Sequence, residues 1–236
     1  MAHFNWLQLL PFVDHHYIHV WTGVAVSLLL ILFAFVARFA LGSGPEAVVP
    51  SGKFSVKGVM EALLEFIVGL SDLVIGEEGR KFVPMFATIF LFILVNNLVG
   101  LIPGMTPSTD NLNTTIGIGL FSFAVYNFYG LKENGLAYLK HFIGPVLWLG
   151  PLMLVIELVS HSIRPLTLGL RLQGNILADH AVLGVFVDIF AGTWVTWFIP
   201  VPAIFYGMGV FVSSMQAFVF TMLSMIYISL AIAHDH

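Results

Sequence analysis

The stretch RPLTLGLRLQGNILADH, residues 164–180, places two arginines, an aspartate and a histidine inside a chain that otherwise avoids charge. Only 9% of the 236 residues are charged, 58% are hydrophobic, and the mean hydropathy is +0.96. A soluble domain carries about 25% charged residues. The chain is therefore predicted to be an all-α polytopic membrane protein, with this charged stretch inside one of its membrane segments.

Apolar runs long enough to cross a membrane recur along the chain, since a spanning helix needs about 20 mostly apolar residues. The Gly/Pro-rich connections LGSGPEAVVPSGK and PGMTPSTDN interrupt them. We predict one membrane domain with five crossings and no internal repeat. Its expected parts are an outer N-terminal segment at 1–17, a first span at 18–41, an interfacial helix at 52–76, two spans with an outer loop at 82–131, and a long tilted helical hairpin at 145–233.

The segment 52–76 is predicted to lie along the membrane surface rather than to cross it. Glu61, Glu65 and Asp72 are spaced by 4 and 7 residues, so they share one face of a helix. The opposite face is apolar. One charged face and one apolar face are typical of a helix at the membrane interface.

The hairpin includes a first arm, about 145–190, that is too long for an upright crossing. At 1.5 Å per residue it would reach about 70 Å, more than twice the hydrocarbon thickness. The arm must kink or lie strongly tilted, with one face turned toward a partner. The motif FIPVPA, residues 198–203, is expected to form the turn before the second arm.

The lysines and arginines predict the orientation, because cytoplasmic loops carry an excess of them. Seven fall on one side if the first span exits at Arg38. The N-terminus is then outside and the C-terminal AHDH is inside after five crossings. The seven residues are Arg38, Lys53, Lys57, Arg80, Lys81, Lys132 and Lys140.

Several polar residues of the long arm share one helical face. Glu157, Arg164 and Arg171 are seven apart, and Ser160 and Asn175 stay near the same line. An arginine in a spanning helix costs about 2.5–3.5 kcal/mol or more and does not lose its proton. Pairing of Arg171 with Glu157 is a poor explanation, because the two lie about 21 Å apart along the axis. Arg164 is expected to snorkel toward the inner surface, so the partner of Arg171 is expected on another subunit.

The motif RPLTLGLRLQGN resembles the signature of subunit a of the F-type ATP synthase membrane sector. Other stretches agree across nearly the whole chain: ELVS fourteen residues before the arginine, MQAFVFTMLSMIYISLAIA near the C-terminus, and NNLVGLIP and NLNTT around the loop of the second and third spans. The resemblance implies a stationary, non-catalytic subunit. It would conduct protons through two offset half-channels to and from the carboxylates of a rotating c-ring.

The resemblance also implies the partners and the compartment. Arg171 would face the c-ring carboxylate, and the chain would contact b-type peripheral stalk subunits, membrane lipid and the rest of the ATP synthase complex. We expect a bacterial inner membrane, no cofactor, no metal site and no nucleic-acid partner. The chain has no cysteine for a thiolate site and no Gly-rich phosphate loop.

The resemblance assigns roles to further residues. Glu157 and Ser160 match the inner half-channel, Asn97 matches the outer path, and Gln216 matches a glutamine near the arginine. The position of His180 carries Glu in many bacterial relatives and His in mitochondrial ones. The complete set of expected ion-translocating residues is Arg171, Asn175, His180, Gln216, Glu157, Ser160, Asn97 and Asp188, with His15, His16 and His19 in an outer vestibule.

Two positions depart from the family pattern. Gly209 replaces a His or acidic residue of many members, and Gly100 replaces an Asp of some. Asp188, about 12 Å beyond His180 by helical rise, is therefore a hypothetical replacement acid. Asp179 is expected to be solvated or bonded within its own helix. Asn96 is expected to form a hydrogen bond between helices.

Two other functions compete with this interpretation. A stand-alone ion channel or transporter using Arg171 as a substrate anchor would be expected to show paired repeats or broken helices, and the sequence has no internal repeat. A purely structural membrane subunit does not explain why a permanent charge accompanies Asn175, Gln216 and His180 in a membrane segment. The subunit a hypothesis alone accounts for the missing carboxylate partner.

Overall fold

The helical architecture comes from a computed structural model that describes residues 5–9, 13–14, 17–41, 55–135, 138, 150–190 and 201–233. These residues form helices and turns, with no strand among them. The elements, in chain order, are η1 (Trp6–Leu9), α1 (Ile18–Leu41), α2 (Val56–Val74), η4 (Glu77–Phe82), α3 (Val83–Gly100), η5 (Ser108–Asp110), α4 (Leu112–Asn134), α6 (Gly150–Phe190) and α8 (Val201–Ile232). The predicted all-α class is confirmed.

Local sequence signals account for several helix ends. Ser55 precedes α2, and its side chain accepts a hydrogen bond from the N–H of Gly58. Asn111 does the same for α4 through the N–H of Asn113 at 2.9 Å. Gly135 ends α4 with φ at 53°, a conformation that glycine adopts without strain.

Among the described residues, four helical stretches are long and apolar enough to span a membrane. They are Ile18–Phe39, Glu77–Gly100, Gly150–Phe186 and Ala203–Ile232. Helix α4, which covers the expected third span, is not among them, because polar and charged residues interrupt its apolar run. The chain is a multi-pass membrane protein, and the fifth crossing stays a prediction.

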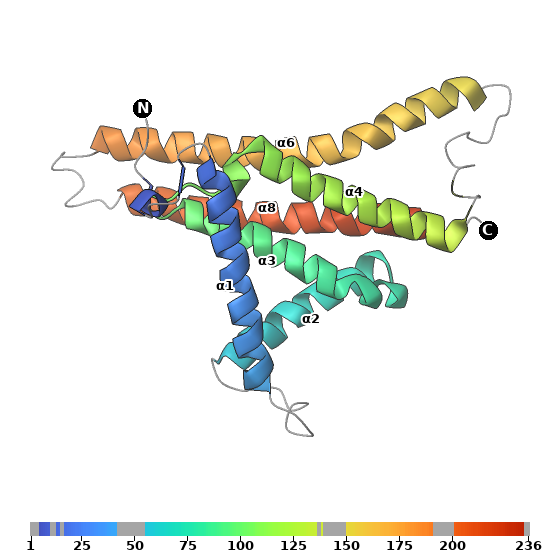
Figure 1. Cartoon of the computed structure of the whole chain (residues 1–236), viewed down its shortest axis with the longest axis horizontal. Coiled ribbons are helices and arrows are strands. Elements are labelled where there is room, and N and C mark those ends of the chain that lie inside the picture. The colour runs from blue at the N-terminus through green and yellow to red at the C-terminus, as the bar shows by residue number, and fades with distance from the viewer. Residues whose placement is uncertain are drawn as a thin grey trace.

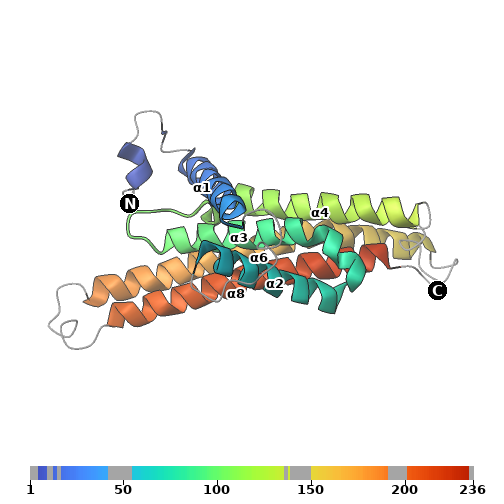
Figure 2. The same cartoon turned by 90° about the horizontal axis from the view of Figure 1, so that it is seen from below.

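Helices α6 and α8 lie side by side and antiparallel along the longest axis of the molecule (Figures 1 and 2). Helix α1 runs across this axis in Figure 1, so the hairpin arms and the first span point in very different directions. Helix α6 has 41 residues with Pro165 inside it, and Figure 1 shows it bending between its gold and orange halves. Proline lacks the N–H for the bond to residue i−4, which explains such a bend. The connection at 191–200 lies outside the described residues.

A core of apolar side chains joins α3 and α8, with α2, α4 and α6 packed around them. Figure 2 shows α2 lying across this group of helices. Helix α2 contributes the fully buried Ile67, in agreement with the expected apolar face of that helix. The largest apolar side chains that are almost completely buried are Phe86, Ile93, Tyr126, Leu172, Ile176, Phe220, Met225 and Ile228.

Ion pairs gather near the turn between α2 and α3. Arg80 pairs with Asp72 at 2.9 Å, and Lys81 pairs with Glu133 of α4 at 2.7 Å. The hydrogen bond from the Arg80 guanidinium holds the pKa of the Asp72 carboxyl below its usual value. The two basic residues of η4 therefore pair with one acid from α2 and one acid from α4 at this end of the helices.

Helices α4 and α6 approach so closely that glycine is required at the contact. A Cβ on Gly119 would lie 2.6 Å from the backbone oxygen of Pro165, and one on Gly169 would lie 3.0 Å from the backbone nitrogen of Ile116. Small residues allow such close backbone approach between membrane helices. These contacts fix the bent part of α6 against α4.

Replacing Gly119 by valine is expected to separate α4 from α6, because backbone atoms cannot move aside as a flexible side chain can. Overpacking of this kind costs about 1–3 kcal/mol. Thermal unfolding of the purified protein in detergent measures the loss. Gly117→Val is the matched control, because a Cβ there meets nothing within 4 Å. Equal melting temperatures for the two variants would contradict the close contact.

Candidate functional site

The side chain of Arg171 is exposed on α6 and makes no hydrogen bond or ion pair with any described residue. Leu172, its neighbour, is fully buried, so this part of α6 turns one face inward and presents the arginine outward. The guanidinium stays charged at any physiological pH. Its counter-charge is not among the described residues of this chain.

One turn along α6, Asn175 bridges to the second arm of the hairpin. Its Nδ2 donates a hydrogen bond to Oε1 of Gln216 at 2.7 Å, and Gln216 is buried. The two residues are 41 positions apart in the chain. The expected neighbours of the arginine therefore meet across the interface of α6 and α8.

Nearer the start of α6, Glu157 pairs with Arg164 rather than with Arg171. Oε1 of Glu157 lies 3.4 Å from NH2 of Arg164, whose guanidinium also lies 5.6 Å from the ring centroid of Tyr227. Ser160 is exposed nearby. Arg164, which was expected to snorkel toward the inner surface, has partners on both α6 and α8.

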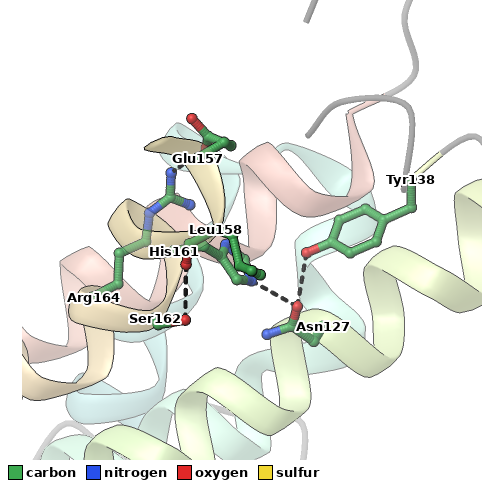
Figure 3. A network of polar contacts seen from close by, with 7 residues as sticks. All are labelled: Asn127, Tyr138, Glu157, Leu158, His161, Ser162 and Arg164. Atoms are coloured by element: carbon green, nitrogen blue, oxygen red, sulfur yellow. Dashed lines mark hydrogen bonds and ion pairs between the residues drawn. The ribbon is translucent and has the colours of Figure 1, made fainter. Parts of the chain in front are cut away.

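A buried polar network lies beside this ion pair (Figure 3). Asn127 of α4 donates from Nδ2 to the carbonyl of Phe123 at 2.7 Å, which leaves its Oδ1 as an acceptor. Tyr138 donates its hydroxyl to this oxygen at 3.0 Å, and Nε2 of His161 lies 2.8 Å from it. His161 must therefore carry its hydrogen on Nε2.

His161 was not among the expected site residues, although it lies in α6 between Glu157 and Arg164. It is one of the few buried ionisable residues of the described chain. The available signal was its spacing of four from Glu157 and three from Arg164, which puts it next to both on a helix. Its actual partner, Asn127, is 34 residues away.

At the other end of α6, a cavity of about 830 Å³ lies beneath the loop 101–111. Trp6 lies on this loop and donates from its indole to the carbonyl of Pro103 at 2.9 Å. Asp110 contributes a carboxylate whose Oδ1 is buried and has no partner among the described residues. The residues that line the cavity include Trp6, Gly100, Asp110, Leu177, His180 and Tyr206.

The ring of His180 occupies the space beside Gly100. A Cβ on Gly100 would lie 2.8 Å from both Cε1 and Nε2 of that ring. The glycine found where some family members carry Asp therefore leaves room for the imidazole. His180 is one of the residues that line the cavity.

Asp179 does not match the expectation of a solvated or locally bonded side chain. It is only partly exposed, and its Oδ2 lies 3.1 Å from the place where a Cβ on Gly209 would be. Asp179 makes no hydrogen bond to the described residues of its own helix. The carboxylate is directed at α8 because the glycine there leaves space for it.

The two asparagines of α3 hold the loop 101–111 in place. Asn96 accepts a hydrogen bond from Ser108 at 2.7 Å, and Asn97 accepts one from Thr109 at 2.8 Å. Both asparagines are fully buried. The expected bonding role of Asn96 agrees with this contact, and Asn97, expected on the outer path, lies beneath the loop instead of lining the cavity.

Of the remaining expected residues, only His19 has a described side chain. His19 is in the first turn of α1 and is partly exposed. Residues 15 and 16 lie outside the described residues, so the expected roles of His15 and His16 are untested. Asp188 is within α6, but its side chain is not described.

Comparison with known proteins gives consistent matches over nearly the full length. A family model described as "ATP synthase A chain" matches residues 19–229. "ATP synthase subunit a" of Bdellovibrio bacteriovorus is 54% identical over 234 residues, 99% of this chain and 99% of that protein. "ATP synthase subunit a 1" of Syntrophotalea carbinolica is 39% identical over 238 residues, 100% of this chain and 95% of that protein.

Replacing Asn127 by leucine is expected to destabilise the fold, because His161 and Tyr138 lose the acceptor that they share. A buried donor left unsatisfied costs about 1–3 kcal/mol. The melting temperature in detergent measures this effect. Ser162→Ala is the control, because that exposed hydroxyl donates only to the carbonyl of Leu158 in its own helix. A control that lowers the melting temperature as much as Asn127→Leu would refute the network's contribution.

Proposed function

Because this chain belongs to the ATP synthase A chain family and is therefore part of an ATP synthase complex, we propose that it conducts protons to a rotating c-ring. It is the stationary partner of that ring and carries out no bond chemistry itself. Proton flow past it turns the ring and so drives ATP synthesis in the catalytic sector.

The observation that carries this proposal is Arg171, which is exposed and has no ion-pair partner among the described residues. A charged arginine on a membrane helix costs about 2.5–3.5 kcal/mol or more unless it is neutralised. Glu157, the acid on the same face, is paired with Arg164. A carboxylate on another subunit neutralises Arg171, and a membrane-embedded c-ring carboxylate supplies it.

The arginine has two effects on such a carboxylate. A positive charge within about 4–6 Å lowers the pKa of a carboxyl by about 1–3 units, which promotes release of its proton. The fixed charge also repels a proton moving directly from one access path to the other. Protons then cross only by riding the ring, and each one moved through 100 mV supplies about 2.3 kcal/mol.

The two access paths lie at opposite ends of α6. The outer path enters the cavity beside His180 and continues toward the hydrogen-bonded pair Asn175 and Gln216. The inner path leaves near Glu157 and Ser160. Twenty-three residues separate Glu157 from His180, which is about 34 Å of helix, so the paths are offset and do not meet.

The helices α6 and α8 present this site to the ring, and the remaining helices face b-type peripheral stalk subunits and lipid. The chain lies in a bacterial inner membrane with its N-terminus outside and its C-terminus in the cytoplasm. Helix α4 provides the fifth crossing. The cluster of Arg80 and Lys81 supports this orientation, since basic residues concentrate on the cytoplasmic side.

Arg171→Ala is expected to abolish ATP-driven acidification of inverted membrane vesicles while the complex still assembles. Without the charge, the ring carboxylate keeps its proton and the two paths can leak into each other. Acridine-dye quenching measures pumping, and immunoblotting measures assembly. Thr167→Val, exposed one turn away and bonded to its own helix, should pump normally. Near-normal pumping by Arg171→Ala would refute the proposed function.

The proposed crossing of α4 can be tested with single cysteines, because the chain has none of its own. Ile102→Cys and Lys132→Cys place exposed thiols near opposite ends of α4. A membrane-impermeant maleimide should label the first in intact cells and the second only in inverted vesicles. Labelling of both thiols from the same side would show that α4 does not cross.

A further inference from the structure

We propose that Asp179 is a proton-transfer residue that links the outer cavity to the ring carboxylate opposite Arg171. This inference rests on the proposed function and extends it to a residue that the sequence analysis expected to be solvated or bonded within its own helix. Three features of the described structure support it: the line of residues on α6, the space at Gly209, and the neighbouring imidazole.

The line of polar residues on α6 leads from the arginine to Asp179. Arg171, Asn175 and Asp179 follow each other at intervals of four, so they lie on one face, one turn apart. The rise from Arg171 to Asp179 is about 12 Å. Asn175 bonds to Gln216 of α8, so this line of residues borders the second arm at Asn175, while Arg171 at its start is exposed.

The space at Gly209 brings the carboxylate into the interface of α6 and α8. A Cβ on this glycine would lie 3.1 Å from Oδ2 of Asp179 and 2.6 Å from Cδ2 of Leu101. The carboxylate of Asp179 thus points at the backbone of α8, and the side chain of Leu101 lies beside the same glycine. The acid occupies a position that a side chain from α8 would otherwise fill.

The neighbouring His180 connects Asp179 to the cavity. Consecutive residues of a helix point about 100° apart, so the imidazole turns toward Gly100 and the cavity while the carboxylate turns toward α8. Among the described residues, the other ionisable groups that line the cavity with His180 are Asp110 on η5 and Tyr206 on α8. Helix α3 contributes none.

The carboxylate of Asp179 does not stabilise the fold through a polar contact with any described residue. Asp179 makes no hydrogen bond and no ion pair with these residues, unlike Glu157, Asp72 and Glu133. A partly buried carboxylate without a partner is unfavourable for folding. A group that serves only stability would be expected to have a partner, whereas a group that exchanges protons needs a free oxygen.

The proposed transfer is a balanced acid–base step. The Asp179 carboxylate accepts a proton that enters through the cavity, by way of the His180 imidazole, and becomes a neutral carboxylic acid. It then releases the same proton toward the ring carboxylate and returns to its ionised form. ATP-driven pumping uses the same steps in reverse.

The test compares Asp179→Asn with Asp179→Glu in the complete complex in inverted vesicles. The asparagine keeps the shape but cannot carry a proton. The rate of ATP-driven proton pumping should therefore fall by at least about tenfold, since a positioned acid–base group contributes about 100-fold to 10,000-fold. The glutamate keeps the carboxyl group and should retain at least about a third of the rate. Glu78→Gln, an exposed acid in η4, is the matched control and should pump normally.

A second variant moves the acid to the facing helix. Asp179→Ala combined with Gly209→Asp offers a carboxyl group from α8 in the vacated space, and only the flexible end of Leu101 must give way. This double variant should pump several times faster than Asp179→Ala combined with Gly209→Ala. Such a recovery follows from proton transfer and not from a stabilising role of Asp179 in α6.

The outcomes separate this inference from the proposed function. Normal pumping by Asp179→Asn, or equal loss in the asparagine and glutamate variants with no recovery in the assembled double variant, overturns the role of Asp179. If Arg171→Ala is inactive in the same membranes, the proposed function stands despite that result. If Arg171→Ala also pumps normally, the proposed function fails as well.

Discussion

A permanent positive charge that has no counter-charge among the described residues governs the arrangement of this protein. Arg171 stands exposed on a membrane helix, and the acid on its own face is already paired with Arg164. Arginine keeps its proton, and none of the described residues neutralises this site. The surrounding structure holds the guanidinium between the Glu157–Arg164 pair toward one end of α6 and the cavity at the other end.

Helix α6 carries Arg171, and the helices packed against α6 determine where each of its polar side chains points. Its 41 residues rise about 60 Å, enough to hold the Glu157 pair and the cavity at separate ends. Gly119 and Gly169 let α4 approach the bent region closely. The antiparallel α8 supplies the buried Gln216 beside Asn175. These contacts hold Arg171 at a fixed place between the two ends.

Glycines at the cavity end determine which acid and base can face each other. Gly100 leaves room for the His180 ring, and Gly209 leaves room for the Asp179 carboxylate. At each of these two glycines, a polar side chain from α6 occupies the space that a larger residue would fill. The departures from the family pattern are therefore linked, because a close-packed interior accepts only one side chain in each space.

The sequence by itself determined the helices and the family, because apolar run length, capping residues and the arginine motif are local features. It did not determine polar partners. Glu157 and Arg164 were predicted on one face but not as a pair, His161 was missed, and Asp179 was expected to stay within its own helix. The last two outcomes depend on Asn127 and Gly209, which are distant along the chain. Only the packing of α4 and α8 against α6 decides them, since hydrogen bonds and steric gaps require atoms within a few ångströms.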